Sequence, residues 1–310
     1  MEKILFKHIP VMLNECIEAL DIKSDGTYVD GTLGGAGHSS KILESGAGQL
    51  IGIDKDDDAL AFASDRLKGY NNVRLVKSDF KDFVNVLDKL GIEKVDGVLL
   101  DLGISSYQVD NGERGFSYRV DAPLDMRMDR TKEFSAYDVV NTYSEEDLKR
   151  ILFTYGEESW APKIARNIVE ARKSEEIETT LQLVKIIESS IPRKFWGSGS
   201  VAKKSFQAIR IEVNGELDGL DEVLRQMAER LNTGGRLAVI TFHSLEDRIV
   251  KNVFKEMSTD CICDKRVPIC TCGHKAIGRL VNKKPIEATK EELTSNKRSS
   301  SAKLRVFEKK

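Results

Sequence analysis

Apolar residues recur along the first hundred residues in two rhythms. Short apolar runs rich in β-branched residues are typical of buried strands, and the stretches between them carry apolar residues at helical spacing. The expected strands are residues 26–30, 49–54, 73–76 and 95–101, and the expected helices begin at residue 39 and span 58–67 and 83–90. Near-continuous apolar strands separated by amphipathic helices predict a parallel sheet covered on both faces.

This rhythm stops between residues 109 and 200, where no run has the character of a buried strand. Helical spacing predicts helices over 137–153, 162–172 and 180–189, then over 205–213, 217–231 and 245–257, with strands at 236–242 and 302–307. The simplest architecture is a doubly wound α/β domain built from residues 1–108 and 201–310, with a helical domain, 109–200, inserted after its fourth strand.

A glycine-rich loop joins the first strand to the next helix. Residues 30–39 read Asp-Gly-Thr-Leu-Gly-Gly-Ala-Gly-His-Ser. Such a loop lets the backbone approach a ligand, and ligands of doubly wound sheets bind beyond the carboxyl ends of the strands. The dinucleotide fingerprint fails because its third glycine falls at Ser40, and a phosphate loop needs Gly-Lys-Ser/Thr. We expect the backbone of Gly34 and Gly35 to line a ligand site.

Acidic residues end or follow the next three strands. Asp54 ends the second, Asp79 and Phe80 follow the third, and Asp101 ends the fourth. A carboxylate at Asp54 can accept both hydroxyls of a ribose, and an acid beside an aromatic ring can bind and pack against adenine. One such acid alone is more simply a helix cap. Three after consecutive strands, with the glycine loop, favour an adenosine-bearing ligand and the pattern of a class I S-adenosylmethionine-dependent methyltransferase.

Long strings of the sequence resemble the ribosomal small-subunit RNA methyltransferase H family, also called MraW. They cover nearly the whole chain and lie at 8–12, 30–39, 101–108, 113–117, 123–129, 155–158, 206–217 and 241–248. The resemblance implies a class I methyltransferase fold with an inserted helical domain and S-adenosylmethionine as methyl donor. It further implies N4-methylation of one cytidine in the decoding region of 16S ribosomal RNA, with the small ribosomal subunit as partner.

The resemblance also assigns cofactor contacts. Those carried over are Ala36, Gly37, His38, Asp54, Phe80, Asp101 and Gln108. Gly34, Gly35 and Asp79 join them from the loop and strand-end arguments above. No metal ion is expected in this site.

Methylating the exocyclic amine of cytosine needs an in-line approach and an acceptor for the amine protons, because the lone pair is delocalised into the ring. The candidate acceptors are Asp101, the Leu102 carbonyl, the hydroxyls of Ser105 and Ser106, and His243 after the fifth strand. His243 has a hydrogen-bonded structural role as its alternative. Many amine methyltransferases carry prolines and an aromatic after the fourth-strand acid. This chain has neither, so Asp101 stays ambiguous between cofactor contact and catalysis.

The formal net charge of −2 hides an uneven distribution. Residues 265–310 contain 13 Lys and Arg against 4 Asp and Glu, a balance of +9, which leaves −11 on the rest. The basic segment is a candidate polyanion contact or a solvated tail. The candidate phosphate contacts are Arg193, Lys194, Lys203, Lys204, Arg210, Lys283, Lys284, Lys297 and Arg298. The aromatic residues Phe195 and Trp196 lie beside two of them.

Four of the five cysteines lie between residues 261 and 272. Four thiolates suit tetrahedral zinc, although one residue between the cysteines of each pair is fewer than usual; reduced surface or packing thiols are the alternative. They form no disulfide framework for 310 residues. No window approaches 18 consecutive apolar residues, and the N-terminus lacks a secretory apolar region. We therefore expect a cytoplasmic protein with no membrane span. The oligomeric state stays open, a homodimer included.

Three rival interpretations remain. The fold can serve a methyltransferase with another substrate, which a substrate screen separates. It can serve a nucleotide-dependent dehydrogenase, against which the missing third glycine argues. It can also serve a non-catalytic ribosome-assembly factor that binds the cofactor as a structural ligand, in which case small-subunit binding occurs without methyl transfer.

Overall fold

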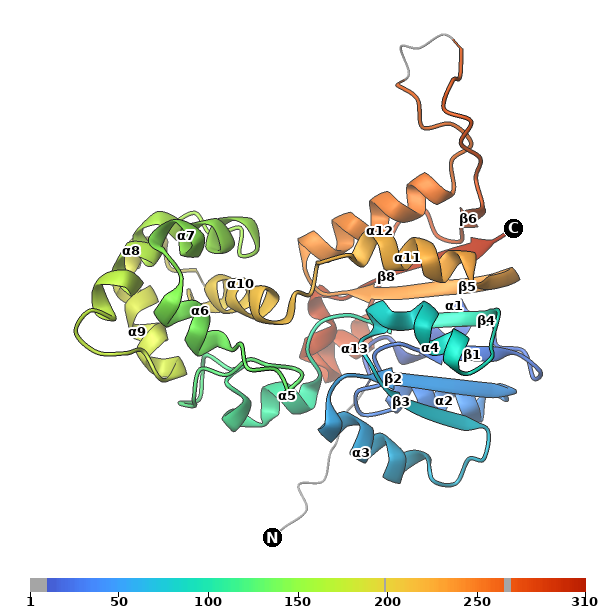
Figure 1. Cartoon of the computed structure of the whole chain (residues 1–310), viewed down its shortest axis with the longest axis horizontal. Coiled ribbons are helices and arrows are strands. Elements are labelled where there is room, and N and C mark those ends of the chain that lie inside the picture. The colour runs from blue at the N-terminus through green and yellow to red at the C-terminus, as the bar shows by residue number, and fades with distance from the viewer. Residues whose placement is uncertain (1–9, 198, 265–268) are drawn as a thin grey trace. The chain divides into compact units, whose positions relative to one another are not determined.

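The computed structural model describes residues 10–197, 199–264 and 269–310 (Figure 1). Two compact units emerge: a sheet unit, which comprises the described residues up to Gly103 together with Gly219–Lys310, and a helical unit, Ile104–Asp218. The expected insertion, 109–200, lies inside the helical unit. That unit extends further at both ends because Ile104 and the helix Lys203–Asn214 pack into its core. The predicted features at residues 8–9, 265 and 266 lie outside the described residues.

The sheet unit is built on a sheet with strand order β3-β2-β1-β4-β5-β8-β6, with β7 pairing β8. The strands are β1 Thr27–Asp30, β2 Gln49–Asp54, β3 Val73–Lys77, β4 Val95–Asp101, β5 Leu231–Thr241, β6 Gly278–Leu280, β7 Ile286–Glu287 and β8 Lys303–Lys309. Strands β1 to β5 run parallel, as predicted, and β8 is antiparallel to β5. The register pairs Asp30 with Gly52 and Leu99, and Asp101 with Ile240. The carboxyl ends of β1, β2, β4 and β5 therefore meet at one edge of the sheet.

Helices cover both faces of this sheet, which confirms the doubly wound α/β class. On one face α1 (Leu13–Leu20), α2 (Gly37–Glu44) and α3 (Asp57–Leu67) pack against the strands in a shared apolar core. On the other face α11 contacts both α4 and α12 (Figure 1). Their bounds, with that of the short helix near the C-terminus, are α4 Phe83–Lys89, α11 Leu220–Glu229, α12 Ser244–Met257 and α13 Lys290–Ser295.

The helical unit has its own apolar core, with residues such as Leu148, Ile164 and Ile209 fully buried. Its helices are α5 Ser106–Asp110, α6 Ala136–Thr142, α7 Glu145–Thr154, α8 Ala161–Ala171, α9 Thr180–Ser190 and α10 Lys203–Asn214. The prediction of one helix over 137–153 is wrong. The chain breaks at Ser144, whose side chain accepts a hydrogen bond from the Asp147 backbone and so starts a second helix.

Three of the family-like strings meet inside the helical unit. The Arg114 guanidinium, 1% exposed, donates to the carbonyls of Arg127 and Met128 at 2.9 and 3.1 Å. Asn214 donates to the carbonyl of Met126 and accepts from the Met128 backbone, both at 2.8 Å. Arg127 itself forms a two-point ion pair with Asp125. The side chains of Arg114 and Asn214 thus hold the segment 126–128 by its backbone, because no regular structure satisfies those groups.

Candidate active and cofactor site

The glycine-rich loop turns sharply after β1. Gly34 and Ala36 adopt left-handed backbone angles, with φ of +46° and +53°. At Gly37 a Cβ atom would lie 2.2 Å from Cγ of Pro10, so only glycine fits at the first residue of α2. The Gly34 N–H donates to Oδ2 of Asp54 at 2.8 Å. The loop is therefore fixed both by its own glycines and by the acid at the end of β2.

Asp54 binds the loop through both carboxylate oxygens. Oδ2 accepts from Gly34, and Oδ1 accepts from the Asp56 backbone at 2.9 Å. Burial raises the pKa of Asp54 to about 6, against the opposing effect of these two N–H donors. Each carboxylate oxygen keeps a second lone pair, which is the acceptor that a ribose hydroxyl needs. The role of Asp54 in holding a ribose stays a prediction.

Asp79 and Phe80 lie at a helix start after β3. The Asp79 carboxylate accepts from the Lys81 backbone at 3.1 Å and caps the short helix Phe80–Asp82, and it also pairs with Lys55 at 3.2 Å. Burial raises the pKa of Asp79, but Lys55 and the cap outweigh it, so the pKa is lowered. The helix-cap interpretation therefore describes what this side chain does, and its contact with adenine stays a prediction.

A buried cluster of acids and His38 lies where β1, α2 and β4 meet. His38 Nε2 lies 2.9 Å from the Val11 carbonyl, to which it must donate, so Nδ1 is an acceptor. Burial lowers the pKa of His38 to about 4, and the ring is neutral at pH 7. Nδ1 lies 3.9 Å from Oδ2 of Asp101. The ring therefore presents a lone pair, and not a positive charge, to the Asp101 carboxyl.

The pKa of Asp101 is raised further than those of Asp30 and Asp54. Burial, followed by the negative charges of Asp30 and Glu246, raises its pKa to about 8. Its backbone N–H donates to the Thr32 hydroxyl at 2.6 Å, which ties β4 to the glycine loop. Among the described residues, Oδ1 of Asp101 is buried and has no hydrogen-bond partner. An unpaired buried acceptor with a raised pKa makes this carboxyl a candidate functional group, and its roles toward cofactor and substrate stay predictions.

Sequence reasoning misses two acids that raise the pKa of Asp101. Asp30, 1% exposed, accepts from the Ser39 hydroxyl at 2.7 Å and from the Thr32 backbone at 3.2 Å, and burial raises its pKa to about 6. Glu246, 2% exposed, lies in the first turn of α12. The sequence does place Asp30 at the end of the first strand, where a site acid is expected. Its full burial depends on tertiary packing, which the sequence pattern does not show.

His243 caps α12. Its Nδ1 accepts from the Glu246 backbone at 3.4 Å, and Glu246 accepts in return from the backbone of His243 and of Phe242. This reciprocal arrangement is a capping box. The structural role considered for His243 is therefore present, and its participation in the reaction stays a prediction.

Ser105 and Gln108 belong to the helical unit and bond to each other. The Ser105 hydroxyl accepts from the Gln108 backbone at 3.2 Å, and the Gln108 side chain accepts from the Ser105 backbone at 3.0 Å, which caps α5. Gln108 is 5% exposed. Their predicted roles toward cofactor and substrate stay predictions, and the side chain of Ser106 lies outside the described residues.

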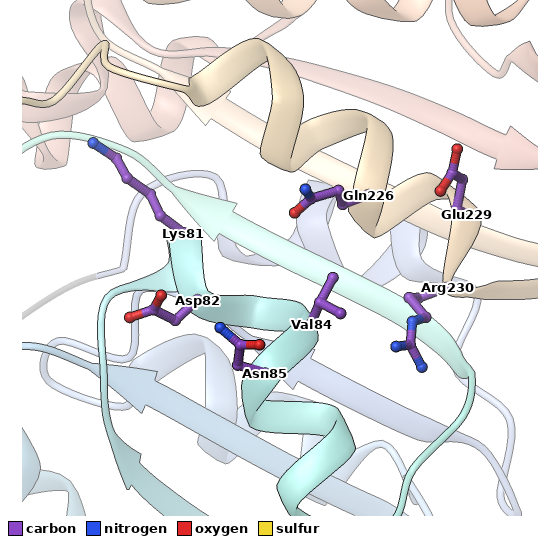
Figure 2. Close-up of a pocket in the computed structure, with 7 residues that line it drawn as sticks. All are labelled: Lys81, Asp82, Val84, Asn85, Gln226, Glu229 and Arg230. Carbon is purple, nitrogen blue, oxygen red and sulfur yellow. The ribbon is translucent and has the colours of Figure 1, made fainter.

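A polar hollow lies between α4 and α11 (Figure 2). Its lining residues are Lys81, Asp82, Val84, Asn85, Gln226, Glu229 and Arg230. None of the predicted site residues is among them. This hollow lies between two covering helices, so we assign it no role in the chemistry.

The parallel sheet, its antiparallel strand β8, the glycine loop after β1 and the acids at the strand ends define a class I S-adenosylmethionine-dependent methyltransferase. The acidic edge suits S-adenosylmethionine, because its sulfonium and amino groups are cations that favour ionised carboxylates. A sequence model of the MraW methylase family matches residues 5–310. The chain therefore belongs to this family, as the sequence predicts, and its cofactor is S-adenosylmethionine.

Two curated relatives from Clostridium botulinum are similar over almost their whole length. Both are described as ribosomal RNA small subunit methyltransferase H. The protein of strain Loch Maree / Type A3 is 56% identical over 306 residues, covering 98% of this chain and 99% of that protein. The protein of strain Kyoto / Type A2 is 55% identical with the same coverage.

None of the helices in the described part of the chain has the length and apolar character of a membrane span.

Proposed function

We propose that the protein methylates the N4 amine of one cytidine in the decoding region of 16S ribosomal RNA, acting on the small ribosomal subunit in the cytoplasm. The names of the relatives support ribosomal RNA as substrate. The observation that carries the catalytic part is Asp101, with its unpartnered buried Oδ1 and a pKa raised to about 8.

Bound S-adenosylmethionine supplies a methyl group on a positively charged sulfur. The Asp101 carboxylate then has a proton to accept, because the cytosine nitrogen loses one N–H as it gains the methyl group. A carboxylate with a pKa near 8 is a much stronger base than an ordinary aspartate and suits proton transfer near neutral pH. A cofactor cation held near this acidic edge would keep Asp101 ionised before transfer. Neutralisation of the sulfur would then raise the proton affinity of the Asp101 carboxylate.

His38 is a positioning residue in this scheme. Its neutral Nδ1, 3.9 Å from Oδ2, can accept a hydrogen bond from Asp101 once that carboxyl is protonated. The Nε2–H bond to Val11 fixes the ring so that Nδ1 keeps facing Asp101. The protonated acid thus has a partner before the proton is released to solvent.

The helical unit offers a surface suited to RNA. Phe195 and Trp196 are 56% and 37% exposed, and Lys194 and Arg193 lie over their rings at 5.1 and 6.0 Å. Exposed rings beside cations can stack on unpaired bases while the cations contact phosphates. Other predicted phosphate contacts have internal partners. Lys204 donates to the carbonyl of Glu157 at 2.8 Å, and Arg210 pairs with Glu216.

The test is methyl transfer from labelled S-adenosylmethionine to small subunits that lack the modification, with the product nucleoside identified by mass spectrometry. We expect N4-methylcytidine with the natural protein and with Asp221→Asn, a surface control, and a loss of at least about 100-fold in rate with Asp101→Asn. Another methylated nucleoside would refute the N4-cytidine assignment. Subunit binding without transfer would favour an assembly factor instead.

A further inference from the structure

A long loop leaves the sheet unit between α12 and β6. Figure 1 shows its two described arms extending outward from α12 and β6. None of the described residues between 258 and 277 is buried, and Ile262 and Ile269 are 52% and 74% exposed. The described part of the loop therefore has no apolar core of its own to hold its shape, and small segments of this kind need another linkage.

Hydrogen bonds close the base of the loop. The Ile277 backbone donates to the Met257 carbonyl at 2.9 Å. His274 Nδ1 lies 2.8 Å from the Thr259 carbonyl, and the Ala276 backbone donates to Asp260 at 3.2 Å. These contacts bring the two arms together at the residues where the cysteines begin.

Above this base, the side chains of four cysteines converge. Cys261, Cys263, Cys270 and Cys272 are all free thiols, and their Sγ atoms lie within 4.8 Å of one another. The Sγ atoms of Cys270 and Cys272 lie 3.6 Å apart, and those of Cys272 and Cys261 lie 3.9 Å apart. A disulfide would require about 2.05 Å. Four sulfurs placed about 2.3 Å from a central Zn²⁺ in a tetrahedron lie about 3.8 Å apart, which matches the observed separations.

Backbone groups of the loop also bond to these sulfurs. Cys272 bonds to the backbone of His274 and Ile262, and Cys263 bonds to the backbone of Thr271. Groups that bond to metal ligands and hold them in place are a usual feature of metal sites.

We propose that Cys261, Cys263, Cys270 and Cys272 bind one Zn²⁺ ion as a structural site. Four S–H groups lose four protons to solvent as the ion enters, which leaves a complex of net charge −2. The ion takes the place of an apolar core and fixes the outer part of the loop. The short spacing within each cysteine pair is no obstacle, because the Sγ atoms of Cys270 and Cys272 lie 3.6 Å apart and all four sulfurs lie within 4.8 Å of one another. This site is independent of the proposed methylation of cytidine.

The first measurement is the metal content of the full-length protein, purified without chelators and with desalting to remove loose ions. We expect one zinc per chain by elemental mass spectrometry. After removal of zinc under reducing conditions, Co²⁺ alone should restore a one-to-one complex with the intense sulfur-to-cobalt absorption of tetrahedral thiolate coordination. Less than about one tenth of a zinc per chain, together with no cobalt absorption, would overturn the proposal.

Variants locate the ion. The double variant Cys270→Ser with Cys272→Ser should lose zinc and the cobalt absorption, whereas Cys16→Ser, which changes the buried cysteine outside the loop, should keep both. Binding of S-adenosylmethionine by calorimetry checks that the double variant is folded. Zinc retained in the double variant refutes the site. If the double variant does not fold, the cobalt spectrum of the natural protein decides, since it reports the number of thiolate ligands directly.

Discussion

Replacing Asp101 with asparagine should stabilise the protein while it abolishes the reaction. The folded-state pKa of this carboxyl is about 8, well above its ordinary value of 3.8. Between these two values the unfolded chain has lost the proton that the folded protein keeps, so the free energy of unfolding falls as pH rises. Asparagine has nearly the same shape and no charge, so it removes this penalty.

The size of the effect follows from the shift. Each pKa unit corresponds to about 1.4 kcal/mol, and about three units separate 3.8 from pH 7, which sets an upper limit of about 4 kcal/mol. Because proteins relax around a buried charge, we expect Asp101→Asn to gain about 2–4 kcal/mol at pH 7. The gain should grow from pH 5 to pH 8 and level off above that.

Urea unfolding of cofactor-free protein at half-unit steps from pH 5 to pH 8.5 measures this gain. Asp30 and Asp54, whose pKa values are raised to about 6, contribute the same decline to both proteins and cancel in the difference. The control Asp221→Asn changes an exposed partner of Arg225 and should alter stability by at most about 1 kcal/mol. A difference between Asp101→Asn and the natural protein that does not change with pH would refute the reasoning.

Three further outcomes are expected. Binding of S-adenosylmethionine should release a proton and tighten from pH 6 to pH 8, because a cation beside the acidic edge lowers the raised carboxyl pKa values. Calorimetry in buffers of different ionisation enthalpy measures the proton release, and pH-independent binding would contradict the prediction. Arg193→Ala with Lys194→Ala should weaken binding to ribosomal RNA and reduce the slope of log affinity against log salt by about 1–2, whereas Lys149→Ala, on the same unit, should leave the slope unchanged. Gly37→Ala should lower cofactor affinity at least about tenfold and also lower stability, because its Cβ has no space, whereas Gly69→Ala, in open space, should do neither; equal effects of the two would refute the packing argument.

The sequence predicts the first four strands of the sheet unit because each is defined by the residues of its own segment. A short apolar run followed by a turn glycine or an acid predicts a strand whatever packs against it. The strands β1, β2, β3 and β4 lie where this pattern places them. The direction of β8 is not readable in this way. Strand periodicity is the same for parallel and antiparallel neighbours, and only the pairing with β5 decides it.

The site is less predictable because the properties of its side chains depend on residues that are far apart in the sequence. The raised pKa of Asp101 requires burial together with Asp30 and Glu246, which lie about 70 and 145 residues away in the chain. The cap formed by Asp79 and the break at Ser144 follow from single side-chain hydrogen bonds that compete with an otherwise continuous pattern. The convergence of the cysteine pairs likewise depends on how the loop closes at its base.

The insertion of the helical unit has a consequence for the order of folding. Neighbouring strands β4 and β5 pair Asp101 with Ile240 across about 140 residues, and closing a loop of that length costs more entropy than closing a short one. The helical unit has its own core, and if it folds first it shortens the flexible chain that must close between β4 and β5. During synthesis, strands β1 to β4 leave the ribosome long before β5. Until β5 is made, the side of β4 that will pair with it has no partner strand. The sheet edge that carries Asp101 is thus completed by one of the last long-range strand pairings. In a nascent chain β4 can pair with β5 only after the helical unit has been synthesised.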